Sequence, residues 1–112
     1  MIFIIRERAT AEQLNQMAEP YFGLMIKLAV DVKREIIAGG GELHYDCEQV
    51  LLGDGSLQQN VWGADWYPEK QQVGFESLIN IRPSQRNRGM EIRDPMLREE
   101  IEIIVRSLLE VR

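Results

Sequence analysis

Residues 25–32 read Met-Ile-Lys-Leu-Ala-Val-Asp-Val, and apolar side chains alternate along them with smaller or charged ones. Successive side chains of an extended chain point to opposite faces. One face of this segment therefore carries Ile26, Leu28, Val30 and Val32, and the other carries Lys27, Ala29 and Asp31. This pattern predicts a strand with one buried face, and the remaining elements are placed by working outward from it.

Further strands are expected on both sides of this segment. Lys33 and Arg34 would turn the chain into a second strand at residues 35–38. Three glycines at residues 39–41 lack a Cβ atom and favour a bulge or bend, after which residues 42–45 would continue the strand. The short apolar run at residues 1–7 is also of strand type.

Two helix starts carry polar capping residues. Thr10 is the predicted N-cap of a first helix, with Gln13 placed to complete a capping box and Pro20 placed to end the helix. Asp46 is the predicted N-cap of a short helix that runs through Leu52. Both helices follow strand-like segments, so the chain alternates between the two kinds of element.

The last helix has the strongest signal. Asp94 is its predicted N-cap and Pro95 its first residue. Its apolar residues recur at helical spacing, opposite Glu99, Glu102 and Arg106; they are Leu97, Ile101, Ile104, Leu108 and Val111. The pattern indicates an amphipathic helix packed on the sheet.

Residues 60–67 and 75–82 predict a hairpin joined by a seven-residue loop. If Tyr67 faces Phe75, then Trp62 lies opposite Asn80 on the less apolar face of the sheet, and Trp66 shares that face. Two tryptophans are often part of a core, but this register favours a groove or a protein interface. A homodimer formed through this face is the expected assembly.

The element order is β-α-β-β-(short α)-β-β-α, in one domain of 112 residues. This order predicts an α+β fold with a five-stranded, mainly antiparallel sheet and two helices, the first and the last, packed on one face.

Net charge restricts the partners. The chain has a formal charge of −5, which opposes general binding to nucleic acid or to anionic membranes. Its single cysteine, Cys47, cannot form an intramolecular disulfide, and the apolar start of the chain is too short for a signal peptide or a membrane span. A cytoplasmic protein is therefore expected.

Positive charge is concentrated in one segment, since residues 82–98 hold five of the ten arginines. Arg82, Arg86 and Arg88 could bind an anionic small molecule or an acidic peptide, with Asn80 and Asn87 as orienting groups. Trp62 would supply a stacking wall. In the alternative, the same groups pair with surface acids such as Glu76, Asp65 or Glu91.

His44, Asp46 and Glu48 form a second candidate cluster, in which ligand-type residues recur at a spacing of two. One histidine and two carboxylates lack the further protein ligand that a metal site usually has, so neither a metal nor a cofactor is predicted. His44 could instead line a ligand site, or act with Asp46 or Glu48 in a hydrolase-like enzyme. The sequence leaves open whether the protein is an enzyme.

Several motifs recur in a known family. They comprise Gly40-Gly41-Glu42-Leu43-His44, Asp46, Leu51-Leu52, Gly55-Ser56, Trp62-Gly63, Ser77-Leu78-Ile79-Asn80-Ile81-Arg82-Pro83-Ser84, Asn87 and Asp94-Pro95. With them the chain resembles, over essentially its whole length, a family of short bacterial and cyanobacterial proteins known only as a domain of unknown function. The resemblance implies a stand-alone soluble domain and brings no activity, cofactor or site residue. A structural or homo-oligomeric interaction module, which would bury a partner against the face of Trp62 and Trp66, is a third functional hypothesis beside binding and hydrolysis.

Overall fold

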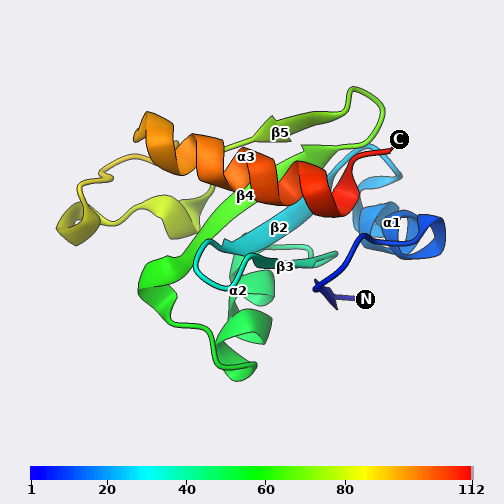
Figure 1. Cartoon of the computed structure of the whole chain (residues 1–112), viewed down its shortest axis with the longest axis horizontal. Helices are drawn as coiled ribbons and strands as arrows, with labels where there is room; N and C mark the ends of the chain where they lie inside the picture. Colours follow the sequence, from blue (N-terminus) through cyan, green and yellow to red (C-terminus); the bar gives the residue numbers. More distant parts are fainter. Residues whose placement is uncertain (112) are drawn as a thin grey trace.

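The computed structural model describes residues 1–111, and its centre is a five-stranded antiparallel sheet in the order β1-β3-β2-β4-β5 (Figure 1). The strands are β1 (Phe3–Ile5), β2 (Ile26–Asp31), β3 (Ile36–Gly39), β4 (Val61–Tyr67) and β5 (Gln72–Gly74). The predicted α+β class, the element order and the five-stranded sheet are confirmed. None of the helices in residues 1–111 is long and apolar enough to cross a membrane.

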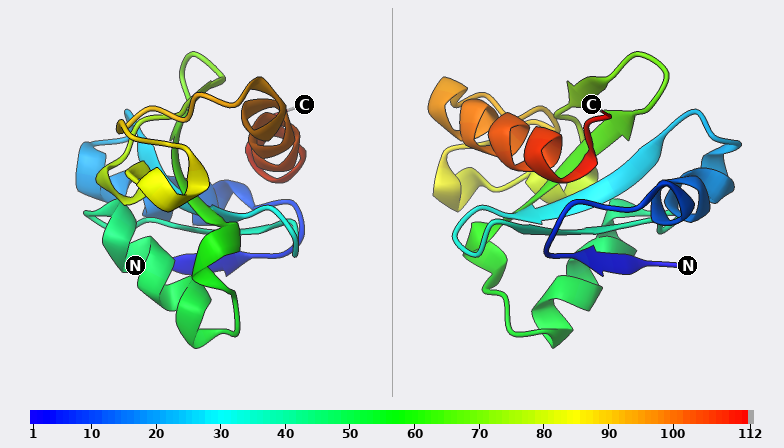
Figure 2. Two further views of the ribbon diagram at one scale, coloured as in Figure 1. Left: turned by 90° about the vertical axis from the view of Figure 1, so that its left-hand side faces the viewer. Right: turned by 45° about the vertical axis from the view of Figure 1, so that its right-hand side comes forward.

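One face of the sheet, called here the first face, carries Ile26, Leu28 and Val30 of β2. Helices α1 (Ala11–Ala18) and α3 (Pro95–Leu109) pack against it, as predicted, and Figure 2 shows both on the same side of the strands. Most of their inward side chains are buried, and Leu14 and Leu97 are partly buried. The buried ones include Met17, Ala18, Ile101, Ile104, Val105 and Leu108. This layer forms the larger core.

The predicted caps of these two helices are present. Thr10 and Gln13 form a reciprocal capping box at the start of α1, and Pro20 lies in the 3-10 turn that follows the helix. The Asp94 carboxylate accepts the backbone N–H of Met96 at 3.0 Å, with Pro95 as the first residue of α3. Local sequence signals were sufficient here because each cap is made within a few residues of the chain.

Helix α2 (His44–Gly53) covers the opposite, second face of the sheet. Its buried residues Cys47 and Leu51 pack against Ala29, Ala38 and Val61, so the alternate positions of the strands are buried too. Both faces of the sheet are therefore buried in a core. The sheet face that looked less apolar in the sequence is covered by α2 and is not exposed.

The placement of the tryptophans on a non-core face is consequently wrong. In the register of β4 with β2, Trp62 lies opposite Val30 and Trp66 opposite Ile26, which puts both rings on the first face. Trp62 is 4% exposed and Trp66 is fully buried. The prediction failed because it assumed only one apolar face, whereas Val61 and Gly63 pack on the second face.

The glycine run ends β3 and does not bulge it. Gly40 has φ +106°, a conformation that L side chains rarely adopt, and a Cβ there would clash with the carbonyl oxygen of Met1. The chain then turns into α2 at His44, so the predicted strand over residues 42–45 is wrong. Leu43 occupies the N-cap and Asp46 lies in the first helical turn, so the predicted cap is three residues late.

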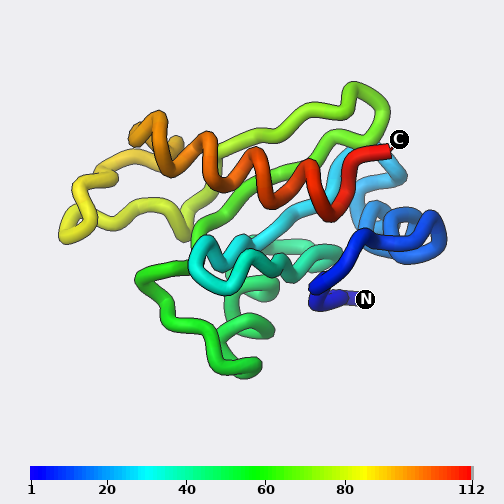
Figure 3. Tube along the Cα trace, in the orientation of Figure 1, coloured from blue at the N-terminus to red at the C-terminus, as the bar shows by residue number. Residues whose placement is uncertain are grey.

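The predicted hairpin partner of β4 is also wrong in extent and register. Gln71 takes a left-handed conformation (φ 53°) and closes a short turn, so that Tyr67 pairs with Gln72 and not with Phe75. Strand β5 ends at Gly74, and residues 75–93 then make a long excursion at one end of the molecule, which Figure 3 traces. This excursion contains the 3-10 turns Leu78–Asn80 and Pro83–Gln85.

Candidate functional site

Arg82 connects the excursion to the rest of the fold. Its guanidinium donates to the Glu48 carboxylate at 3.1 Å and to the carbonyls of Gln58 (2.8 Å) and Ile79 (3.0 Å). It also stacks on the Trp62 ring, 4.6 Å from the centroid, and its side chain is only 10% exposed. Arg82 and Trp62, which the sequence predicted as a ligand-binding arginine and a stacking wall, are thus in contact with each other.

The Glu48–Arg82 pair is shielded from water. Burial raises the pKa of Glu48, although the Arg82 charge opposes this. Burial also lowers the pKa of Arg82, although the Glu48 charge opposes that. Each partner is costly to bury alone, so the pair links α2 to the Pro83–Gln85 turn.

Both predicted orienting amides have internal partners. The Asn80 side chain accepts the N–H of Gly63 at 2.8 Å and donates to the Gly63 carbonyl at 3.0 Å. The Asn80 amide thus forms the two backbone hydrogen bonds at Gly63 that a neighbouring strand would otherwise form. Asn87 donates to the Asn80 carbonyl (2.7 Å) and accepts the N–H of Arg93 (3.1 Å). A ligand could reach either amide only by displacing these bonds.

Three arginines of the excursion remain exposed. Arg86, Arg88 and Arg93 make no ion pair with any residue in the described part of the chain. Arg86 and Arg93 line the same surface hollow beside the start of α3, together with Asp94 and Glu100. Of the predicted anion ligands, the structure thus leaves Arg86 and Arg88 available and adds Arg93.

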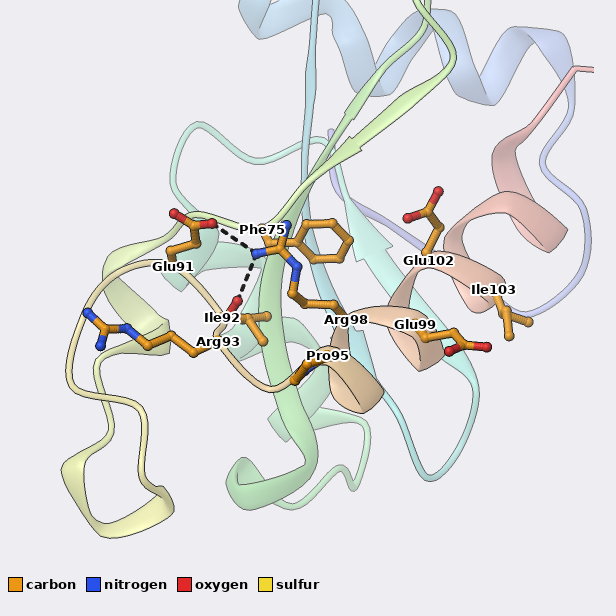
Figure 4. Close-up of a pocket in the computed structure, with 9 residues that line it drawn as sticks. All are labelled: Phe75, Glu91, Ile92, Arg93, Pro95, Arg98, Glu99, Glu102 and Ile103. Atoms are coloured by element: carbon orange, nitrogen blue, oxygen red, sulfur yellow. Dashed lines mark hydrogen bonds and ion pairs between the residues drawn. The ribbon is translucent and has the colours of Figure 1, made fainter.

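A larger, open hollow of about 740 Å³ lies against α3, and Figure 4 shows its lining. Arg98 stacks on Phe75 at 4.3 Å and donates to the Glu91 carboxylate and to the Ile92 carbonyl, both at 2.9 Å. Arg93 points away from this group toward the excursion (Figure 4). Because its central cation is already bonded within the protein, this hollow offers a ligand little new chemistry.

His44 lies at the first position of α2, over the second face of the sheet. Its Nε2 atom is 2.7 Å from Asp65 Oδ1 and 3.2 Å from the carbonyl oxygen of Ala64. Both partners are acceptors, so Nε2 carries the proton, and in the neutral ring Nδ1 is an acceptor. The partner of His44 is thus Asp65, and not Asp46 or Glu48 as the hydrolase hypothesis assumed.

Asp65 reaches His44 because of the alternation of β4. It lies opposite Lys27 of β2 and shares the second face with Tyr67. The His44 and Asp65 side chains are 10% and 9% exposed, so the pair is nearly buried. Sequence reasoning missed Asp65 as a site residue, although a carboxylate between Ala64 and Trp66 in an otherwise apolar strand was a usable signal.

A cavity of about 410 Å³ opens beside this pair and is called here the His44 cavity. Its lining combines charged and hydroxyl groups with apolar side chains; the residues are Lys27, Leu43, His44, Tyr45, Asp65, Tyr67, Glu76, Ser77, Leu78, Ile79 and Met90. Burial, followed by the charges of Asp65 and Glu76, raises the pKa of Tyr67, so its phenol is neutral at ordinary pH. The cavity is thus lined by both apolar and polar side chains.

Nucleophilic and metal chemistry have little geometric support here. Ser77 lines the His44 cavity, but its Oγ accepts the N–H of Ile79, and no hydrogen bond within residues 1–111 joins it to His44. Burial raises the pKa of Cys47 to about 11, so that thiol is unreactive. In the same part of the chain, no group of three or more His, Cys, Asp or Glu residues could hold a metal ion.

Comparison with known proteins gave one match. A family model with the description "protein of unknown function (DUF5674)" matches residues 3–108. No curated protein and no solved structure matches the chain.

Proposed function

The chain belongs to the family described as proteins of unknown function (DUF5674), and from the geometry of its residues we propose that it is a small-molecule-binding protein whose ligand occupies the His44 cavity. One observation carries this proposal: a fixed, nearly buried His44–Asp65 pair meets apolar walls in a single cavity. Ligand sites are typically apolar concavities of about 300–1,000 Å³ with a few convergent polar groups.

The rim of the cavity supports the same proposal. Leu78 is 71% exposed, and Leu43 and Tyr45 are also exposed beside it. All three line the cavity, so the exposed apolar surface continues into it. An apolar ligand would remove this surface from water and gain roughly 25 cal/mol for each Å² buried.

A thermal-shift screen with a panel of small amphipathic metabolites tests the proposal. A ligand that binds only the folded state raises the melting temperature. We expect hits with the wild type, loss of those hits in Leu78→Asp, and their retention in Leu24→Asp. Leu24 is a similarly exposed leucine that does not line the cavity. A panel without hits, or hits that Leu78→Asp leaves unchanged, would contradict the proposal.

A second candidate function is the binding of an anion by Arg86, Arg88 and Arg93. The observation that favours it is the exposure of three arginines that have no acidic partner in residues 1–111. The nearby Glu91 is paired with Arg98, and Asp94 caps α3. Phosphate or carboxylate groups suit the forked donors of arginine, but open exposure weakens such contacts in salt.

A phosphate titration followed by NMR tests this second candidate. We expect amide shifts in residues 84–93 of the wild type and smaller shifts in Arg86→Ala and Arg88→Ala. Lys70→Ala is the control, since Lys70 is an exposed base in the β4–β5 turn. Flat amide signals at millimolar phosphate, or equal responses of all variants, would remove the anion site.

A further inference from the structure

The two carboxylates that line the His44 cavity have unused hydrogen-bond acceptors. Asp65 uses Oδ1 for His44, and Oδ2 has no hydrogen-bond partner in the described residues. His44 donates from Nε2 to this carboxylate and so leaves Oδ2 free. Glu76, another lining residue, adds a second carboxylate. A ligand group that binds these carboxylate oxygens must supply donors.

The cavity also lacks a paired cation. Lys27 is opposite Asp65 in the strand register, but its ammonium lies over the Tyr21 ring, 5.2 Å from the centroid. Within residues 1–111, no lysine or arginine forms an ion pair with Asp65 or Glu76. Two carboxylates therefore share the cavity with one lysine that is turned toward an aromatic ring.

Building on the proposed function, we propose that the ligand is a primary amine with an apolar body, bound as its ammonium ion. The ammonium donates to Asp65 Oδ2 and to Glu76, and the body rests on Leu78, Ile79 and Leu43. The neutral phenol of Tyr67 also lines the cavity and offers either a hydrogen bond or its ring face to the cation.

The charge of the whole chain agrees with this ligand class. With a formal charge of −5, the protein attracts cations and repels anions at long range. The exposed arginines lie on the excursion at residues 86–93 and do not line the His44 cavity. An amine therefore meets favourable charge at long range and inside the cavity.

Three probes of the same chain length separate charge from apolar contact: n-hexylamine, 1-hexanol and hexanoate, titrated at pH 7 and followed by amide NMR. We expect hexylamine to bind at least about tenfold more tightly than hexanol, because charge-assisted hydrogen bonds are added to the same apolar contact. Hexanoate should bind more weakly than either, and the shifts should fall in residues 43–45, 65–67 and 76–79.

Substitutions of the two cavity carboxylates test whether they bind the ammonium group. Glu76→Gln should weaken hexylamine binding several-fold and leave hexanol binding unchanged, whereas Glu69→Gln, an exposed acid outside the cavity, should change neither. Asp65→Asn should lose the amine preference as well, but it also removes the negative charge next to His44. Glu76→Gln keeps the test decisive if Asp65→Asn does not fold.

The outcomes separate the two proposals. Equal binding of hexylamine and hexanol, or a preference for hexanoate, overturns the amine inference and leaves small-molecule binding in place. If none of the three probes shifts the cavity amides, the amine inference is also overturned, and the thermal-shift panel decides the proposed function separately.

Discussion

At the scale of single residues, the excursion after β5 is fixed by side chains that replace backbone pairing. Asn80 is fully buried and bonds to both the N–H and the carbonyl of Gly63. Gly63 permits this close approach, because a Cβ there would come within 2.5 Å of Ser77 Cβ. Residues that looked like ligand groups in the sequence thus hold the wall of the His44 cavity in place.

We expect Asn80→Ala to lower the free energy of unfolding by about 2–4 kcal/mol, because it leaves two buried backbone groups of Gly63 unpaired. Urea denaturation measures this, with Asn15→Ala as the control, since Asn15 is exposed on α1. A loss below about 0.5 kcal/mol, which is typical of surface sites, would show that the Asn80 bonds do not hold the excursion.

The Glu48–Arg82 pair gives a pH dependence of known sign. Burial raises the folded-state pKa of Glu48 above its unfolded value, so the folded protein holds this proton more tightly. The contribution of this proton to the free energy of unfolding is fully present at pH values below the unfolded-state pKa. It is lost as the pH rises through the folded-state pKa. We therefore expect the wild type to lose stability relative to Glu48→Gln as pH rises from about 4.5.

Urea melts at several pH values between 4 and 7 measure the difference between the two proteins. Glu99→Gln, which replaces an exposed acid of α3, should give a difference that hardly changes over the same range. If the difference for Glu48→Gln stays constant or changes in the opposite direction, attraction by Arg82 outweighs burial, and the sign assigned to the pKa of Glu48 is wrong.

At the scale of elements, the helices with local caps were predictable and the segments decided by distant contacts were not. Thr10, Gln13 and Asp94 bond within their own turns, so the sequence was enough to find α1 and α3. The end of β3 and the path of the chain after β5 involve distant contacts, namely the approach of Gly40 to Met1 and of Gly63 to Ser77. These contacts have no local signature.

The candidate site likewise has residues that the sequence identified and contacts that it could not predict. His44 was identified as a possible site residue because ligand-type residues recur at a spacing of two from it, but its partner Asp65 is 21 residues away in the sequence. The pairing depends on α2 starting at His44 and on the face that β4 presents. The concentration of arginines in residues 82–98 was visible from composition, but composition did not show that Arg82 is paired with Glu48.

Helix α3 offers a matched pair for testing the larger core. Ile101 is fully buried on the first face, whereas Ile103 in the same helix is 60% exposed. We expect Ile101→Ala to cost about 2–5 kcal/mol of unfolding free energy, and Ile103→Ala to stay within about 0.5 kcal/mol of the wild type. Equal effects of the two substitutions in urea melts would mean that α3 packs through a different face.

At the scale of the whole molecule, the charge distribution separates two surfaces. The excursion carries exposed arginines, whereas the chain as a whole is acidic and the His44 cavity holds two carboxylates. The predicted homodimer rested on an exposed tryptophan face, and both rings lie in the core, so that reason no longer applies. Self-association stays a prediction for light scattering to test.

The net charge of −5 should prevent general binding to nucleic acid. In fluorescence anisotropy at physiological salt, we expect no change when the protein is added to random-sequence single-stranded DNA or RNA. Binding that weakens steeply as salt is added would instead show that the exposed arginines override the net charge.

Crystals of the protein soaked with a fragment library test the central claim most directly, because they show where small molecules bind without assuming what they are. We expect fragments to collect in the His44 cavity, in contact with the His44–Asp65 pair and the exposed Leu78. Fragments found only at the arginines of residues 86–93 or in the hollow against α3, with none in the His44 cavity, would contradict the account.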